Sequence, residues 1–294
     1  MTVRIDIAIC TFRRPHLADT LQSLARLELA PGWDVRIIVA DNDETPSARG
    51  ICDSAAIPFP VNYIHAPAFN ISTARNACID ASNGDYLAFI DDDEFASPGW
   101  MTALTDSAAG ADVVLGPVHA RYSPSCPLWI RAGDYHSSIP VAQNGRLISG
   151  GTGNVLLRRA FIGPVRFRTA LGRSGGEDTA FFSDLEKRGA RFAIRPDAIV
   201  YESVPEARES LHWLLRRRFR YGETHGLLLR ETARGMAGRL RHALPAAAKT
   251  GFCAVMAAVH LPVRDRARRW TLRGALHAGV VTHLLRRQKE ASHG

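Results

Sequence analysis

Four consecutive acidic residues, Asp91 to Glu94, are the part of this sequence best suited to chemistry. They follow residues 86–90, a short apolar and aromatic run after Gly84 that predicts a buried strand. Carboxylates crowded at the end of a buried strand repel one another and therefore need a positive partner. Hard cations such as Mg²⁺ and Mn²⁺ take oxygen ligands, and Mg²⁺ typically combines one or two carboxylates with substrate phosphates. The run therefore indicates a divalent cation with a phosphate-bearing substrate.

The acidic run has two alternative interpretations. A solvated acidic loop remains open, although runs of acids lie more often on helix surfaces than directly behind a buried strand. An EF-hand loop is excluded, because Phe95 and Ala96 stand where that loop needs a polar residue and a glycine.

A second pair of acids, Glu177 and Asp178, follows two glycines and begins a predicted helix over residues 179–187. Carboxylates in the first turn of a helix are stabilised in the ionised form by the helix dipole. Ordinary helix-start chemistry and a catalytic role therefore both explain the pair. The glycine-rich segment 150–154 is weaker evidence, because a flexible turn before a strand explains it equally well.

Alternating strands and helices must position these acids. We expect strands at 3–9, 35–40, 61–65 and 86–90, with helices at 16–29 and at 72–81, the second capped by Ser72. This order predicts an α/β fold with a doubly wound, mostly parallel sheet, whose strand carboxyl ends form the ligand-binding edge. Further strands are expected within 113–115, 154–157, 190–194 and 198–201, around a long polar loop from 122 to 146.

Several classes are excluded by missing patterns. The first strand-to-helix turn, residues 10–15, contains no glycine, which removes the dinucleotide-binding fingerprint, and no GxxxxGK[ST] loop exists. The five cysteines form no CxxC pair, so zinc ribbons and disulfide scaffolds are not expected and a reducing compartment is favoured. The N-terminus has no long apolar stretch of the kind found in signal peptides.

The charge is distributed unevenly and suggests two domains, 1–208 and 209–294. The first carries 20 basic and 24 acidic side chains, whereas the second carries 17 and 5. A basic region of this kind is expected to meet an anionic partner, either a membrane surface, a phosphate-bearing substrate or nucleic acid.

The basic region contains two apolar stretches. Residues 209–222 show helical spacing with several arginines, which fits either a packed helix with a solvated face or contacts to a diphosphate. Residues 244–263 are apolar but interrupted by Pro245, Lys249 and Pro262, so we expect a poor transmembrane segment. With flanking arginines, this stretch is typical of a helix lying on an anionic membrane surface; packing onto the rest of the protein is the alternative.

Five motifs occur in an order that resembles family 2 glycosyltransferases of the GT-A fold. They are Ile9-Cys10-Thr11-Phe12-Arg13-Arg14-Pro15, Val39-Ala40-Asp41-Asn42, Ser72-Thr73-Ala74-Arg75-Asn76, Phe89-Ile90-Asp91-Asp92-Asp93-Glu94 and Gly176-Glu177-Asp178. The resemblance covers about residues 3–222 and is greatest to bacterial exopolysaccharide glycosyltransferases of the succinoglycan-glucosyltransferase type.

The resemblance implies a nucleotide-sugar donor, a UDP-sugar above all, and a divalent cation, Mn²⁺ or Mg²⁺. Asp178 matches the catalytic base, Asp93 the metal ligand, and Asp91 the residue shared by the metal and the diphosphate. Asp41 matches the position of the uracil contact. The positions implied in nucleotide-sugar binding are Thr11, Arg13, Asp41, Arg75, Asp91, Asp92, Glu177, Arg217 and Arg218, with Trp213 beside the last two. Glu94, an aspartate in many relatives, departs from the pattern as the outermost carboxylate.

We therefore expect an inverting glycosyltransferase that uses one carboxylate base opposite the leaving group, without a second nucleophilic carboxylate. It would extend a lipid-linked oligosaccharide or glycan in exopolysaccharide synthesis, peripheral on the cytoplasmic face of the plasma membrane. One alternative is a metal-dependent nucleotidyltransferase, which needs a basic glycine loop near the first strand that this chain lacks. The other is nucleic-acid binding by the basic region, which has neither a zinc pattern nor interleaved aromatics and is not expected.

Overall fold

The computed structural model describes residues 2–143 and 146–286 of the chain. It contains two compact units, one of residues 1–122 and 136–204 and the other of residues 123–135 and 205–294. We call them the sheet unit and the helical unit. The predicted domain boundary at 208/209 lies four residues beyond the boundary at 204/205 in the structure. The prediction also did not assign the segment 123–135 to the second domain. Residues 287–294 of the predicted basic region lie outside the described residues.

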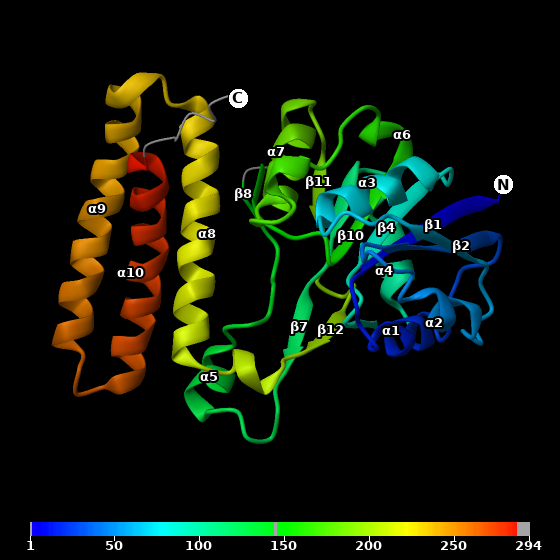
Figure 1. The fold of residues 1–294 in the computed structure, drawn as a ribbon, viewed down its shortest axis with the longest axis horizontal. Coiled ribbons are helices and arrows are strands. Elements are labelled where there is room, and N and C mark those ends of the chain that lie inside the picture. The colour runs from blue at the N-terminus through cyan, green and yellow to red at the C-terminus, as the bar shows by residue number, and fades with distance from the viewer. Residues whose placement is uncertain (1, 144–145, 287–294) are drawn as a thin grey trace. The chain divides into compact units, whose positions relative to one another are not determined.

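A seven-stranded sheet forms the centre of the sheet unit (Figure 1). In spatial order its strands are β11 (Phe192–Ile194), β6 (Val113–Leu115), β10 (Asn154–Arg158), β4 (Tyr86–Ile90), β1 (Val3–Thr11), β2 (Trp33–Asp41) and β3 (Val61–His65). Strand β10 runs antiparallel to both neighbours, and the other pairs are parallel. The predicted α/β architecture with a mostly parallel sheet is confirmed.

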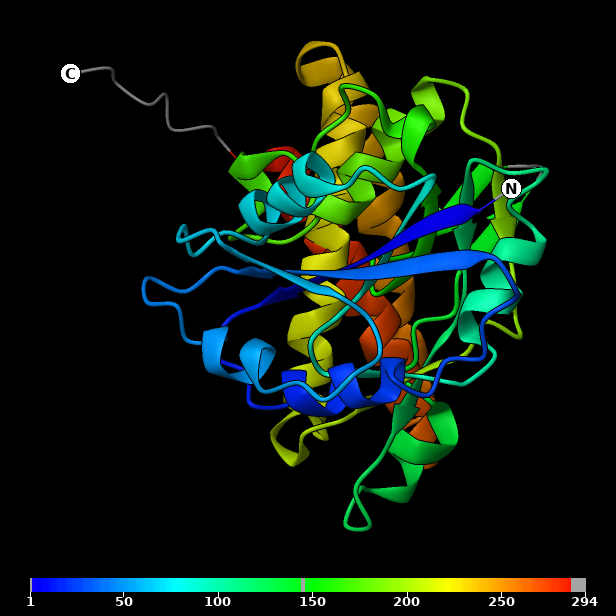
Figure 2. The same ribbon diagram turned by 90° about the vertical axis from the view of Figure 1, so that its right-hand side faces the viewer.

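Strand β1 is buried on both faces, which explains its nearly continuous apolar sequence. Because side chains alternate along a strand, Ile5, Ile7 and Ile9 join one core cluster while Ala8 and Cys10 join the other. The helices that contribute to the first cluster are α1 (Leu17–Leu24), α2 (Arg49–Asp53) and α4 (Trp100–Asp106). Those that contribute to the second are α3 (Ile71–Ala81), α6 (Arg159–Ile162) and α7 (Glu177–Lys187). Figure 2 shows the sheet lying between these two helix layers.

The short strands expected within 113–115, 190–194 and 198–201 are present, whereas other short strands were not predicted, because three or four residues seldom show a periodic pattern. A second sheet has the order β5 (Glu94–Ala96), β12 (Val200–Ser203) and β7 (Val118–Arg121), and a third pairs β8 (Val141–Gln143) with β9 (Arg146–Ser149). A 3₁₀ turn, η1 (Thr169–Leu171), lies between α6 and α7. The expected loop 122–146 was wrong in part, because it contains α5 (Leu128–Gly133) and β8; residues 144–145 lie outside the described residues.

Helix α3 begins one residue earlier than predicted, and Asn70 rather than Ser72 is its N-cap. The Asn70 side chain accepts hydrogen bonds from the backbone N–H groups of Ser72 and Thr73 at 3.1 and 3.3 Å. Its amide group also donates to the carbonyl oxygen of Thr169 at 2.8 Å. The cap therefore fixes α3 to the segment that leads into α7.

The helical unit is built on three long helices, α8 (Leu211–Thr232), α9 (Gly235–Val259) and α10 (Arg264–Leu285), with η2 (Glu206–Arg208) before them. Helix α10 packs against both α8 and α9. A Cβ atom on Gly222 would clash with the carbonyl oxygen of Leu276, so glycine allows the backbones of α8 and α10 to approach closely. The segment 123–135 joins this unit because Ser123 N–H donates to Glu209 at 2.8 Å and the Arg268 guanidinium stacks on Trp129.

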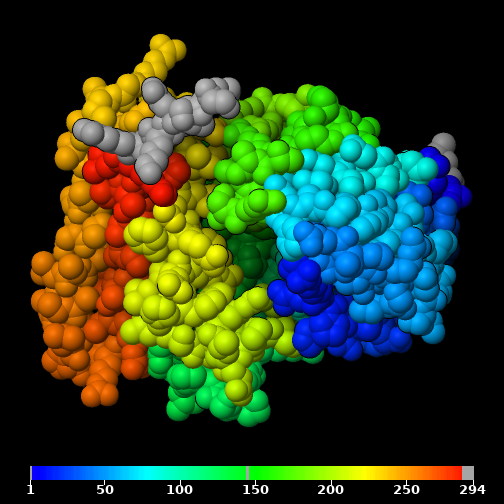
Figure 3. All heavy atoms as spheres, viewed as in Figure 1, coloured from blue at the N-terminus to red at the C-terminus, as the bar shows by residue number. Residues whose placement is uncertain are grey.

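Helix α9 continues through Pro245, contrary to the expected interruption of the apolar stretch. In the described part of the chain it is the one helix long and apolar enough, by length and composition alone, to cross a membrane. The length and apolar composition of α9 differ from the prediction of a poor transmembrane segment. Core helices of soluble proteins can have the same length and composition. Only 17% of the most apolar 18-residue window of α9 is buried. Figure 3 shows the atoms of α9, in orange, open to view along much of the helix.

Candidate active site

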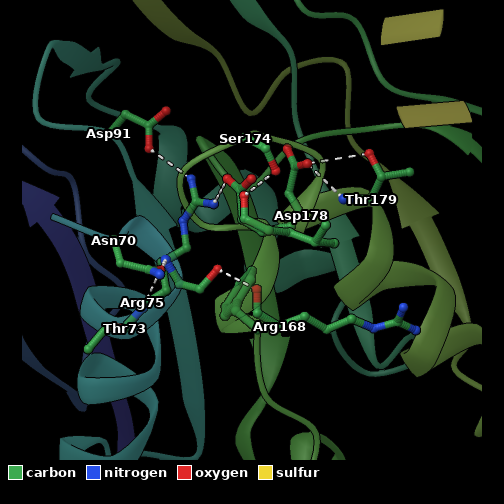
Figure 4. Close-up of polar contacts among 12 residues, drawn as sticks. Asn70, Thr73, Arg75, Asp91, Arg168, Ser174, Asp178 and Thr179 are labelled. Atoms are coloured by element: carbon green, nitrogen blue, oxygen red, sulfur yellow. Dashed lines mark hydrogen bonds and ion pairs between the residues drawn. The ribbon is translucent and has the colours of Figure 1, made fainter. Parts of the chain in front are cut away.

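Arg75 on α3 joins the two acidic motifs. Its guanidinium Nη1 donates to Oε1 of Glu177 at 2.7 Å, and its Nη2 lies 3.7 Å from Oδ1 of Asp91. Figure 4 shows the Arg75 side chain reaching between Asp91 and the start of α7. The Arg75 side chain is 8% exposed, and the charges of Asp91, Glu177 and Asp178 raise its pKa against the opposing effect of burial. The structure therefore brings the carboxylates of Asp91 and Glu177 to the same guanidinium group.

The acids after β4 differ in their surroundings. Asp92 is buried and accepts a hydrogen bond from the Thr11 hydroxyl at 2.7 Å. Burial raises the pKa of Asp92 to about 6, although the Thr11 hydrogen bond opposes that shift. The side chains of Asp91 and Asp93 are 44% and 18% exposed, so they are the carboxylates of this run that solvent reaches.

Glu94 is a buried residue, which corrects its interpretation as the outermost carboxylate. It begins β5, is 3% exposed, and accepts a hydrogen bond from the backbone N–H of Asp91 at 2.8 Å. Burial, with the charge of Asp91 as the next cause, raises its pKa well above the ordinary value. Glu94 therefore stabilises the turn by binding the Asp91 backbone, and it does not join Asp91 and Asp93 as a possible metal ligand.

The glycine-rich segment 150–154, which was only weak evidence in the sequence, lies against both acidic motifs. A Cβ atom on Gly153 would lie 2.5 Å from Oε1 of Glu94 and 3.1 Å from Oδ2 of Asp91. A Cβ atom on Gly151 would lie 3.5 Å from Oδ2 of Asp178. Glycine at 153 is needed because the carboxylates occupy the space that a side chain would fill.

Asp178 stands in the first turn of α7. The two preceding residues, Gly175 and Gly176, have φ angles of 89° and 92°, a left-handed conformation that glycine adopts without strain. One carboxylate oxygen, Oδ1, accepts from the Thr179 backbone N–H at 2.7 Å, while no hydrogen bond to Oδ2 is recorded within the described residues. Asp178 is half-buried, whereas Glu177 is buried and tied to Arg75. Each acid has one oxygen without a hydrogen-bond partner among the described residues, but Asp178 is the more exposed of the two.

Asp41 and Asp43 build the loop after β2. The carboxylate of Asp41 is fully buried and accepts from Tyr63 OH and the Ala48 backbone N–H, both at 2.8 Å. A contact between the Asp41 carboxylate and the uracil of a donor stays a prediction, and it would require these hydrogen bonds to rearrange. Arg13 donates to Asp43 at 2.9 Å and holds the pKa of that carboxyl low, at about 2. Thr11, Arg13 and Asp41 therefore lie at the predicted sheet edge, each already engaged by a protein partner.

The oxygen donors fit a hard cation whose coordination a substrate completes. Asp91 and Asp93 offer partly exposed carboxylates, the donor type that Mg²⁺ and Mn²⁺ prefer. Across residues 2–143 and 146–286, no group of three or more His, Cys, Asp or Glu side chains is arranged to hold a metal unaided. Bound cation would therefore need oxygens from the diphosphate in addition to these two acids.

The three candidates from the basic region, Trp213, Arg217 and Arg218, lie on α8 of the helical unit. Arg217 stacks on Trp213 at 5.2 Å and donates to Tyr221 OH at 2.7 Å. Their contact with a diphosphate stays a prediction.

The match to a known family decides the enzyme class of this chain. Residues 6–162, which include the first four motifs, match the family described as glycosyl transferase family 2. The chain belongs to this family. Its enzymes transfer sugars; the roles of the two acidic motifs in such a reaction stay predictions.

Two curated proteins are similar in sequence to this glycosyltransferase. It is 50% identical over 290 residues to the succinoglycan biosynthesis protein ExoM of Rhizobium meliloti, covering 97% of this chain and 94% of ExoM. It is 25% identical over 240 residues to the glucosyl-dolichyl phosphate glucuronosyltransferase of Haloferax volcanii, covering 75% of each protein.

Solved structures agree on the fold. The glycosyltransferase superposes on S. aureus TarS with a TM-score of 0.54 and 14% identity, covering 95% of this chain and 55% of that one. TarS residues 1–349 in complex with UDP-GlcNAc give a TM-score of 0.52 at 13% identity, with 91% of that chain covered. At these identities the likeness supports the GT-A-like fold alone.

Proposed function

We propose that this enzyme is an inverting, metal-dependent hexosyltransferase that moves glucose or a related hexose from a UDP-sugar to a lipid-linked or polysaccharide acceptor. The synthesis of an exopolysaccharide of the succinoglycan type is supported by the ExoM relative. A UDP-sugar is supported by the TarS complex with UDP-GlcNAc, and a lipid-linked acceptor by the Haloferax enzyme, whose name contains glucosyl-dolichyl phosphate.

Each acidic motif has one chemical task. The acceptor hydroxyl gives its proton to Asp178 as its oxygen bonds to the anomeric carbon of the sugar. The bond between that carbon and the diphosphate oxygen breaks, and the electron pair leaves with UDP. Asp91 and Asp93 would hold a divalent cation, which supplies positive charge to the leaving diphosphate. Attack opposite the leaving group inverts the anomeric centre.

One observation carries this proposal: Arg75 contacts both Asp91 and Glu177, the residue next to Asp178. A base on α7 and a cation site after β4 come from segments far apart in the sequence, and the shared guanidinium keeps them together. A solvated acidic loop would not need a buried cation of this kind.

A donor screen tests the proposal. Purified enzyme is incubated with UDP-, GDP- and TDP-sugars, with and without Mn²⁺, and release of the nucleoside diphosphate is measured. We expect hydrolysis of a UDP-sugar that stops when EDTA removes the metal and returns when Mn²⁺ is added. Equal turnover in EDTA would contradict metal dependence. Release of pyrophosphate from nucleoside triphosphates would instead favour the nucleotidyltransferase alternative.

We also propose that α9 lies on the anionic cytoplasmic surface of the plasma membrane, where a lipid-linked acceptor would be found. Leu244, Phe252, Val255 and Val259 follow helical spacing and are 65%, 56%, 61% and 65% exposed. Exposed arginines flank the apolar stretch at Arg241, Arg264 and Arg266. An apolar face between basic ends is typical of a helix in the membrane interface.

Vesicle flotation checks the membrane contact. We expect the enzyme to float with vesicles containing phosphatidylglycerol and much less with phosphatidylcholine alone. Phe252→Asp should weaken vesicle binding about tenfold or more, because burial of one aromatic side chain contributes about 1.5–3 kcal/mol. Leu128→Asp is the matched control, since Leu128 is 80% exposed outside this face and should leave binding unchanged. Resistance of the cell-bound enzyme to alkaline extraction would favour a spanning helix instead.

A further inference from the structure

Two adjacent arginines after β1 contact different carboxylates. Arg13, with a left-handed φ of 54°, pairs with Asp43, its Nη2 lying 2.8 Å from Oδ1. Arg14 instead places Nη1 3.2 Å from Oδ2 of Asp93. Only Arg13 was expected from the sequence to take part in donor binding, yet Arg14 is the one that reaches the acidic run.

The Arg14–Asp93 ion pair has a more exposed arginine than the ion pairs of Arg75, and its partners can be replaced more easily. Arg14 and Asp93 are 38% and 18% exposed and share one recorded contact, whereas Arg75 is 8% exposed and donates to Glu177 at 2.7 Å. Partly exposed ion pairs contribute little to stability, so exchanging the partner of Asp93 costs little.

We propose that Arg14 neutralises Asp93 while the metal site is empty, and that it turns to the donor diphosphate when a divalent cation binds Asp93. The inference rests on the proposed function, because it assigns Asp93 to the metal. Arginine is suited to this exchange, since its planar guanidinium binds carboxylate and phosphate oxygens in the same forked geometry. Arg14 is therefore a competitor of the cation before the donor arrives and a ligand of the donor afterwards.

The two roles predict opposite effects of one substitution. Arg14→Ala should bind Mn²⁺ alone about two- to fivefold more tightly, because a competing charge is removed. With Mn²⁺ saturating, the same variant should bind UDP about tenfold or more weakly, because a charge-assisted contact is lost. Free Mn²⁺ is measured by its electron paramagnetic resonance signal, and UDP binding by titration calorimetry.

Two further variants make the result decisive. Arg13→Ala removes the same charge next door but leaves Asp93 paired, so its affinity for Mn²⁺ alone should equal that of the wild type. Arg14→Lys keeps the charge and should retain wild-type Mn²⁺ affinity while recovering only part of the UDP affinity. An Arg14→Ala enzyme with unchanged Mn²⁺ affinity, or with unchanged UDP affinity, overturns this role. A wild-type enzyme that binds UDP equally well without metal overturns the proposed metal dependence instead.

Discussion

Replacing Asp178 by asparagine is expected to abolish measurable turnover while leaving UDP–Mn²⁺ binding nearly intact. The amide cannot accept the proton of the acceptor hydroxyl, and general-base catalysis is typically worth about 10²- to 10⁴-fold in rate. The side-chain carbonyl of asparagine can still accept from the Thr179 backbone N–H, as Oδ1 of Asp178 does at 2.7 Å. Steady-state rates of sugar transfer and calorimetric titration with UDP and Mn²⁺ measure the two quantities separately.

Glu186→Gln is the matched control for Asp178→Asn. It removes one carboxylate charge from the same helix, at a residue whose recorded partner is the exposed Arg146. We expect its kcat and its UDP affinity to match the wild type. If Asp178→Asn instead loses UDP binding together with turnover, Asp178 holds the donor and is not the base.

The acids on either side of this site show how far a sequence predicts function. A strand pattern followed directly by carboxylates correctly placed Asp91 to Asp93 at a sheet edge, because strand burial is a local periodic property. The same reasoning failed for Glu94. It belongs to a three-residue strand, β5, whose pairing with β12 turns the side chain into the protein, and no local pattern reveals a partner about 100 residues away.

Long-range contacts account for the other differences. The resemblance implies a nucleoside-binding role for Arg75, which stays a prediction, whereas its contacts with carboxylates 16 and 102 residues away could not be read from the sequence. Gly153 likewise gains its importance only when folding brings it against Glu94 and Asp91. In each case the residue type was visible in the sequence, whereas its partner depended on the topology of the sheet.

Two helix features differ from what local sequence preferences predict. Ser72 is a reasonable N-cap by type, yet Asn70 two residues earlier takes the role because its amide also binds Thr169 across the fold. Proline usually breaks a helix interior, yet α9 continues through Pro245. At the start of α3, a contact with a distant segment therefore outweighs the local preference for Ser72.

Removing the Arg75 side-chain charge is expected to destabilise the sheet unit strongly. In Arg75→Met, Glu177 stays buried without its cation, and loss of one partner of a buried pair typically costs about 3–5 kcal/mol. Oε2 of Glu177 already lacks a hydrogen-bond partner among the described residues, so little remains to stabilise the charge. Urea unfolding followed by fluorescence measures the free energy of unfolding.

A double-mutant cycle separates the lost ion pair from lost packing. Glu177→Gln in the Arg75→Met background removes the unpaired charge, so the double variant should be more stable than Arg75→Met alone. We expect the two substitutions to deviate from additivity by at least about 1 kcal/mol, since contacting residues in one network couple by about 0.5–3 kcal/mol. Strictly additive losses would mean that Arg75 stabilises the unit through its stacking on Phe167, at 5.3 Å, rather than through Glu177. In that case the two acidic motifs would be neighbours without being energetically coupled. The Arg75 guanidinium would then not explain how α7 positions Asp178 relative to the donor.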